Sequence, residues 1–220
     1  MSTAASVRDR RPTVLEGIAV FVIAWYAFPG PLWWNTPLHT LRAPYAWSWT
    51  QHLWMALLPL ACCALFGRRI PLGTFRRMEL RRALVPALAV LGISVLGLFI
   101  AYLSPLRPMI AANTPHGPGT LFFEAIAPGL GEEVLFRGWL QTALNRAFPR
   151  FGTLLASLAF GFIHLSNSGP PAFVHFVAAY VVLVGLGLGI LYARSGNLWI
   201  TIIVHNVADL LNMAILAVLP

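Results

Sequence analysis

Residues 83–104 read ALVPALAVLGISVLGLFIAYLS, 22 consecutive residues without a charged side chain. An apolar stretch of more than about 18 residues is typical of a helix that crosses a lipid bilayer. The stretch therefore predicts a transmembrane helix.

The composition of the whole chain agrees with a membrane environment. The 220 residues are 58% hydrophobic and 10% charged, with a mean hydropathy of +0.74. Soluble domains carry about 25% charged residues. We therefore expect most of the surface to face lipid.

Six further apolar segments predict helices on either side of this one. They are Val14–Trp34, Thr50–Phe66, Thr120–Phe148, Thr153–Ser166, Pro171–Arg194 and Leu198–Leu219. The expected fold is all-α, a polytopic transmembrane bundle of about seven helices. Pro128 and Gly129 are expected to kink the long fourth segment, and the fifth segment is short for a span.

The arginines predict the orientation of this bundle. The formal charge is +8, and all 15 basic residues are arginine. With seven spans, one side holds the N-terminus and the loops after spans two, four and six, with Arg8, Arg10, Arg11, Arg68, Arg69, Arg76, Arg77, Arg81, Arg82, Arg146, Arg150 and Arg194. The other side holds only Arg42 and Arg107. Cytoplasmic loops are enriched in arginine, so we expect a cytoplasmic N-terminus.

Nucleic-acid binding, a signal peptide and a cysteine site are simpler interpretations of parts of this sequence, and none of them is expected. The arginines lie between apolar segments and not on a soluble face, so nucleic-acid binding is not expected. The first apolar segment has no clear small-residue cleavage site, so we interpret it as a retained span and not a signal peptide. Cys62 and Cys63 are neighbours in an apolar run, and we expect neither a mutual disulfide nor a metal site.

Ionisable residues within the apolar segments are the candidate functional groups, because charges inside a bilayer are costly unless they are paired. They are Glu124, Glu132, Glu133, Arg137, His164, His175, His205 and Asp209. At 1.5 Å per residue, Glu132, His164 and His205 lie at comparable depths of about 10–18 Å from the arginine-rich side. We therefore expect these three to meet.

Helical spacing separates the two adjacent glutamates. Glu133 and Arg137 are four residues apart and share a face, which favours an ion pair. Glu132 lies about 140° around the helix from Arg137, so it is expected to be free for chemistry. His205 and Asp209 also share a face, and Phe160 precedes His164 by one turn.

The remaining ionisable residues receive structural interpretations. His175 and Glu124 are interpreted as partners in helix–helix hydrogen bonds. His39, His52 and His116 are interpreted as inert residues in loops or at helix edges.

The motifs formed by these residues resemble a known family. Glu132-Glu133-Val134-Leu135-Phe136-Arg137 matches EExxxR, Phe160 to His164 matches FxxxH, and His205 to Asp209 matches HxxxN/D. In this order on successive membrane helices, they resemble the CPBP family of intramembrane proteases, which includes CAAX prenyl endopeptidases and bacteriocin-processing or immunity proteins. The resemblance covers roughly residues 120–215.

The resemblance implies peptide-bond hydrolysis by an activated water, without a covalent enzyme intermediate, and no metal or other cofactor is expected. Glu132 and His164 would hold and deprotonate the water, and His205 with Asp209 would stabilise the oxyanion. Glu133, Arg137 and Phe160 would support these residues. Residues 1–118 would then form N-terminal membrane helices 1–3 with arginine-rich cytoplasmic segments, and residues 119–220 a catalytic bundle within the same membrane domain.

Two alternatives remain open at this point. Glu132, His164 and His205 could instead be zinc ligands of a membrane protease, although no HExxH is present. The chain could also be a non-catalytic membrane scaffold or a bacteriocin-immunity protein. The expected partners are a lipid bilayer and a membrane-associated peptide or protein substrate, with prenylated CAAX-type peptides among the candidates. The expected location is a bacterial cytoplasmic membrane.

Overall fold

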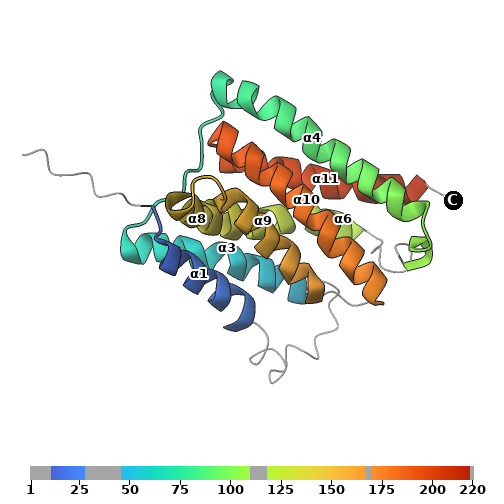
Figure 1. The fold of residues 1–220 in the computed structure, drawn as a ribbon, viewed down its shortest axis with the longest axis horizontal. Coiled ribbons are helices and arrows are strands. Elements are labelled where there is room, and N and C mark those ends of the chain that lie inside the picture. The colour runs from blue at the N-terminus through green and yellow to red at the C-terminus, as the bar shows by residue number, and fades with distance from the viewer. Residues whose placement is uncertain (1–10, 28–45, 110–117, 167–169, 219–220) are drawn as a thin grey trace, which may run out of the picture.

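The computed structural model describes residues 11–27, 46–109, 118–166 and 170–218, and these residues form an all-α bundle (Figure 1). In chain order, its elements are α1 Val14–Val22, a π turn η1 Ile23–Ala27, α3 Ala46–Phe66, α4 Arg77–Tyr102, α6 Pro118–Glu124, α7 Ala127–Glu133, a π segment η3 Val134–Gln141, α8 Thr142–Ala147, α9 Gly152–Ile163, a 3₁₀ turn η4 His164–Ser166, α10 Pro171–Ser195 and α11 Leu198–Val218. The prediction of an all-α chain is confirmed.

Four of these helices are long and apolar enough to cross a bilayer. Their spans are Trp49–Phe66, Arg77–Tyr102, Pro171–Ser195 and Leu198–Val218. The segments Val14–Trp25 and Gly152–Ile163 are apolar but shorter. The chain is therefore an integral membrane protein by its helices, and the predicted count of seven helices agrees only roughly with the spans. The predicted end of the first segment at Trp34 lies outside the described residues.

The predicted single helix Thr120–Phe148 is wrong. The chain breaks between α6 and α7, where Ile126 has φ −134° and ψ −53°, and Pro128 stands in the first turn of α7. Proline fits the first turn of a helix because its missing N–H would have no partner there. The kink expected near Pro128 is thus a complete break, and α7 begins as a separate short helix.

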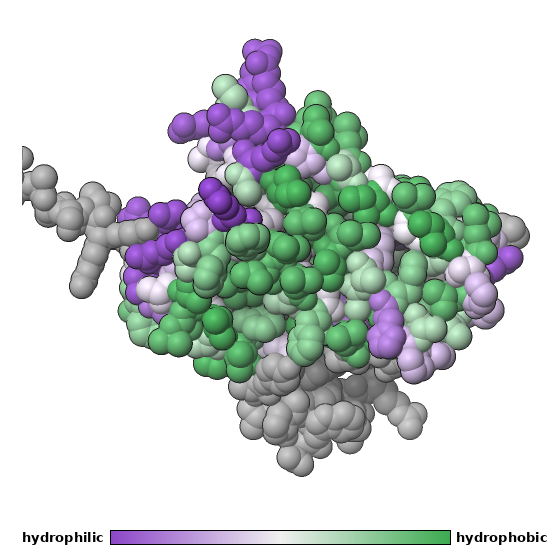
Figure 2. All heavy atoms as spheres, viewed as in Figure 1, coloured by the Kyte–Doolittle hydropathy of each residue, from purple (hydrophilic) through white to green (hydrophobic). Residues whose placement is uncertain are grey.

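Helix ends rich in arginine gather at one end of the bundle, where α1 and α4 begin and α10 ends (Figure 1). Hydrophilic residues crowd this end, while hydrophobic residues cover much of the visible face (Figure 2). Contacts tie the end together: Arg68 pairs with Glu16, and the Asn197 amide donates to Glu79 at 2.8 Å. The loops predicted to share one side therefore do lie together, although Arg8, Arg10 and Arg42 are outside the described residues.

Side chains of the π segment η3 donate hydrogen bonds to glycine carbonyls of α10. The carbonyl of Gly185 accepts from Arg137 Nη2 at 3.0 Å, and the carbonyl of Gly189, one turn further, accepts from Gln141 Nε2 at 2.9 Å. A Cβ at Gly185 would lie 2.8 Å from the Phe160 ring and 3.2 Å from Arg137. These glycines of α10 thus allow polar side chains of η3 to reach the backbone of α10. Single π turns within helices are frequent at functional sites.

The N-terminal helices pack on this unit and do not form a separate layer. Val20, Met55, Leu135 and Trp139 share one buried cluster, and the Trp139 indole donates to the Glu16 carbonyl at 3.1 Å. Cys62 and Cys63 are free thiols. Residues from both halves of the chain therefore enclose the same interior.

Candidate active site

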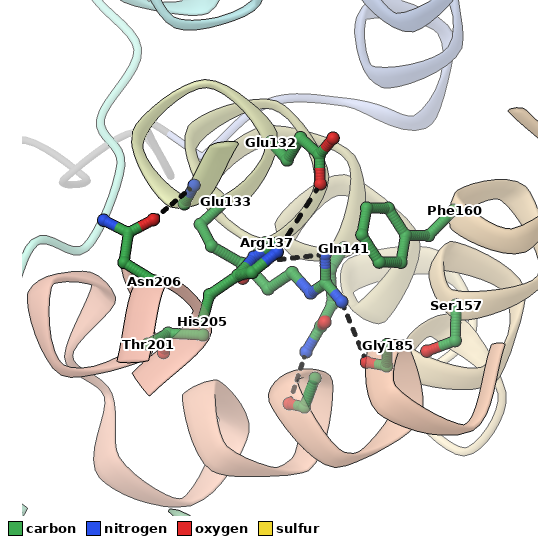
Figure 3. Close-up of polar contacts among 12 residues, drawn as sticks. Glu132, Glu133, Arg137, Gln141, Ser157, Phe160, Gly185, Thr201, His205 and Asn206 are labelled. Atoms are coloured by element: carbon green, nitrogen blue, oxygen red, sulfur yellow. Dashed lines mark hydrogen bonds and ion pairs between the residues drawn. The ribbon is translucent and has the colours of Figure 1, made fainter. Parts of the chain in front are cut away.

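The two adjacent glutamates of α7 point in different directions (Figure 3). Glu132 faces a cavity, with 12% of its side chain exposed, whereas Glu133 is fully buried. Neighbouring residues on a helix are separated by about 100°. A single turn of α7 thus supplies one carboxylate to the cavity and one to the helix interface behind it.

Glu133 is held by a cation and an imidazole. Its Oε1 lies 3.1 Å from Arg137 Nη1 and 2.8 Å from His205 Nδ1. The Arg137 guanidinium also lies over the Phe160 ring, with its central carbon 4.5 Å from the ring centroid. The ion pair expected from the spacing is present, and Glu133 has a second, unexpected partner on α11.

His205 connects the two glutamates (Figure 3). Because a carboxylate accepts hydrogen bonds, the contact to Glu133 places a proton on Nδ1 and turns Nε2 toward the cavity. Nε2 lies 3.7 Å from Glu132 and 3.5 Å from Asp209. Glu133 therefore fixes the orientation of the imidazole, and Asp209 contacts the nitrogen that faces the cavity.

His164 stands where α9 passes into the 3₁₀ turn. Its Nδ1 is 2.8 Å from the Phe160 carbonyl. A carbonyl only accepts, so Nδ1 donates and Nε2 remains available to the cavity. The rings of Phe160 and His164 meet edge-on, 5.1 Å apart. The helical spacing of these two residues predicted this contact.

The interpretation of His52 as an inert loop or edge residue is wrong. His52 lies within α3, and its Nε2 donates to Glu132 Oε1 at 3.3 Å. Its ring also meets the edge of Phe123, with centroids 5.3 Å apart. Glu132 thus lies between imidazoles from α3 and α11, and the one from α3 carries no recognisable motif.

Asn206 is a second residue that sequence reasoning missed. Its Oδ1 accepts from Gly129 N at 2.7 Å, and its Nδ2 donates to the Ala125 carbonyl at 3.0 Å. Backbone groups at a helix break need such partners when they are buried. Asn206 therefore holds the start of α7 against α11, one residue from His205. Its position next to a motif histidine was the available signal.

These side chains line one cavity of about 280 Å³. Its walls come from α3, α4, α6, α7, α9, α10 and α11, with His52, Ser94, Phe123, Glu124, Pro128, Glu132, Phe160, His164, Tyr180, Val181, Val184, His205, Asp209 and Asn212. Glu132, His164, His205 and Asp209, which the sequence singled out, are all among them. Glu124 also lines the cavity, and no hydrogen bond from its side chain to another described residue supports its interpretation as a helix–helix partner.

Helices α3 and α7 approach each other closely at Gly131, and this approach brings His52 next to Glu132. A Cβ at Gly131 would lie 2.5 Å from the His52 carbonyl oxygen and 2.8 Å from its Cα. Gly131→Ala must therefore push α3 outward, and we expect it to lower the free energy of unfolding by about 1–3 kcal/mol. Gly92→Ala on α4 meets nothing within 4 Å and should cause no loss. Thermal unfolding of both variants in lipid nanodiscs measures the difference, and equal stability would contradict this packing.

Apolar helices around a buried cluster of carboxylates and imidazoles define a membrane protein with an internal polar site. Residues 115–211 match the profile of a family described as type II CAAX prenyl endopeptidase Rce1-like. The resemblance drawn from the motifs is thereby confirmed. No curated protein and no solved structure matches the chain.

Proposed function

We propose that the protein is an intramembrane endopeptidase that hydrolyses a peptide bond of a membrane-associated substrate, with Glu132 as the general base. One observation carries the proposal: the Glu132 carboxylate faces the cavity between His52 and His205, at 3.3 and 3.7 Å. A carboxylate held in this way can take a proton from a water that attacks a carbonyl carbon. The family match supports the reaction class.

The other residues take roles that follow from their contacts. His164 presents Nε2 to the cavity and would hold the attacking water with Glu132. Protonated His205 would donate from Nε2 to the oxyanion of the tetrahedral intermediate, because such donors act strongly where water is excluded. Asp209, 3.5 Å from that nitrogen, would orient it. Glu133 and Arg137 would hold His205 in a fixed position relative to α7.

The substrate class and orientation form the finer part of the proposal. The family description points to prenylated CAAX-type peptides, and the gathered arginine ends fit the cytoplasmic side of the membrane. Cleavage would then occur on a peptide that enters from the cytoplasmic leaflet. Incubation of the purified protein with a farnesylated, dye-labelled CAAX peptide tests the activity, and recovery of the intact peptide alone would count against it.

His52 is proposed as a positioning residue for Glu132. His52→Ala removes the donor, and we expect kcat to fall about 10- to 100-fold with KM changed less than about threefold, since a buried hydrogen bond to a charged group contributes about 1.5–3 kcal/mol. His52→Gln retains an N–H and should restore part of kcat. Steady-state kinetics separates the two parameters. A rise in KM at unchanged kcat would show that His52 serves binding instead.

A zinc-dependent mechanism through the same residues predicts a different response to chelators. Within the described part of the chain, no group of three or more His, Cys, Asp or Glu side chains is arranged to hold a metal ion. Our proposal predicts equal cleavage before and after treatment with 1,10-phenanthroline. Loss of cleavage that added zinc restores would replace the proposed mechanism by the zinc-dependent one.

A further inference from the structure

Three helices bring polar side chains to a part of the cavity wall that the proposed reaction does not use. Ser94 on α4, Tyr180 on α10 and Asn212 on α11 all line the cavity. Val181 and Val184 line the same cavity. Polar groups inside a membrane bundle are normally hydrogen-bonded, so the partners of these three decide their role.

Part of their hydrogen-bonding capacity is unused. Asn212 Nδ2 donates to the Tyr180 hydroxyl at 3.3 Å, but Asn212 Oδ1 has no hydrogen-bond partner among the described residues. Ser94 Oγ, on a residue that is only 1% exposed, lies beside the Tyr180 hydroxyl but makes no well-aligned hydrogen bond to the described residues. A buried polar group without a partner costs about 1–3 kcal/mol. The wall thus offers an unpaired amide acceptor at Asn212 and, at Ser94, a hydroxyl that can donate to a ligand.

The position of Asn212 relates this patch to the reacting groups. Asn212 lies two helical turns beyond His205 on nearly the same face of α11, with Asp209 between them. At 1.5 Å per residue, the separation along the helix is about 10 Å. An extended peptide covers that distance in about three residues at 3.3 Å each. The patch lies toward the end of the bundle opposite the arginine-bearing end.

We propose that Ser94, Tyr180 and Asn212 form a subsite for a backbone amide of the substrate, about three residues from the bond that is cleaved. The inference rests on the proposed function. The amide N–H would donate to Asn212 Oδ1, and its carbonyl would accept from the Ser94 hydroxyl. The ligand is a neutral amide and not a terminal carboxylate, because no arginine or lysine is among the described residues that line the cavity.

A cycle of ligand and protein changes tests the subsite. The ligands are a dye-labelled farnesylated peptide that ends in a CAAX tetrapeptide, and a series in which each backbone amide of the peptide, within the tetrapeptide and before it, is replaced in turn by an ester. An ester lacks the N–H donor but keeps the shape. Binding is measured by fluorescence anisotropy in nanodiscs with the Glu132→Gln variant, so that the result does not depend on turnover.

One ester position is expected to weaken binding about 5- to 100-fold, because it leaves a buried acceptor unpaired. In Glu132→Gln/Asn212→Leu, the same ester should have an effect of less than about twofold. Ser94→Ala should weaken binding of the parent peptide. Ser157→Ala, a buried serine bonded to the Thr153 carbonyl at 2.8 Å, serves as the matched control and should not.

The outcomes separate the two proposals. If the parent peptide does not bind, or if every ester acts equally with and without Asn212, the subsite is wrong. Binding with the expected coupling but no cleavage by the wild type would leave the subsite standing and overturn the proposed hydrolysis. Cleavage without the coupling would do the reverse. Thermal unfolding of each variant confirms that it is folded.

Discussion

Exchange of Glu132 for glutamine is expected to reduce the rate of peptide hydrolysis by about 10²–10⁴-fold, the contribution usual for a general base. Glutamine has nearly the same shape and can still accept from His52 and His205, but it cannot take a proton from water. KM for the farnesylated peptide should change little, because the cavity keeps its form. The measurement is steady-state cleavage in nanodiscs at matched protein concentration.

Glu124→Gln is the matched comparison, since it makes the same change in a second carboxylate on the cavity wall. We expect it to lose less than about tenfold. If both variants lost activity equally, a general effect of negative charge in the cavity would explain the result better than a base at Glu132. If Glu132→Gln kept full activity, the proposed mechanism would be wrong.

Removal of Arg137 is expected to cost about 3–5 kcal/mol of the free energy of unfolding, the usual effect of leaving one partner of a buried ion pair uncompensated. Arg137 is 1% exposed, and Glu133 is fully buried. In Arg137→Met, the Glu133 carboxylate keeps His205 as a partner but loses the guanidinium. The gap beside Gly185 and Phe160 adds to the loss.

The double variant Glu133→Gln/Arg137→Met should recover part of this stability, because it removes the uncompensated charge. Arg194→Met, at the exposed end of α10, is the control and should change stability by less than about 0.5 kcal/mol. Equilibrium unfolding in mixed micelles of detergent and SDS measures all three. A double variant that is no more stable than Arg137→Met would contradict the coupling between Glu133 and Arg137.

Helical periodicity predicted the parts of the site that lie within one helix. The spacing of Glu133 and Arg137 predicted their ion pair, and it separated Glu132 as the carboxylate that faces elsewhere. The step from Phe160 to His164 predicted their ring contact. Such inferences succeed because neighbours along one helix are fixed by its geometry alone.

Contacts between distant helices could not be predicted in this way. His52 meets Glu132 because α3 approaches α7 at Gly131, and neither the glycine nor the histidine specifies its partner in the sequence. Likewise, the hydrogen bonds of the Asn206 side chain exist only because the chain breaks before α7. Pro128 indicated a bend there, but proline is compatible with both a kink and the first turn of a new helix.

The hydropathy pattern predicted where helices form more accurately than it predicted which of them are long and apolar enough to cross the membrane. Length and composition qualify α3, α4, α10 and α11 as spanning helices. The segment around Glu132 fails this criterion because it is broken and carries polar residues. Catalysis and membrane insertion require different residues in such a segment. A catalytic group needs polar neighbours, whereas a helix that faces lipid does not tolerate them.

Mass spectrometry of the farnesylated CAAX peptide after incubation in H₂¹⁸O tests the central claim most directly. The purified wild type, with chelator present, is predicted to release a fragment whose new carboxylate carries one ¹⁸O, and Glu132→Gln is predicted to release at least about 100-fold less of it in the same time. An intact peptide with the wild type, or equal cleavage by Glu132→Gln, would contradict a glutamate-activated water in this cavity.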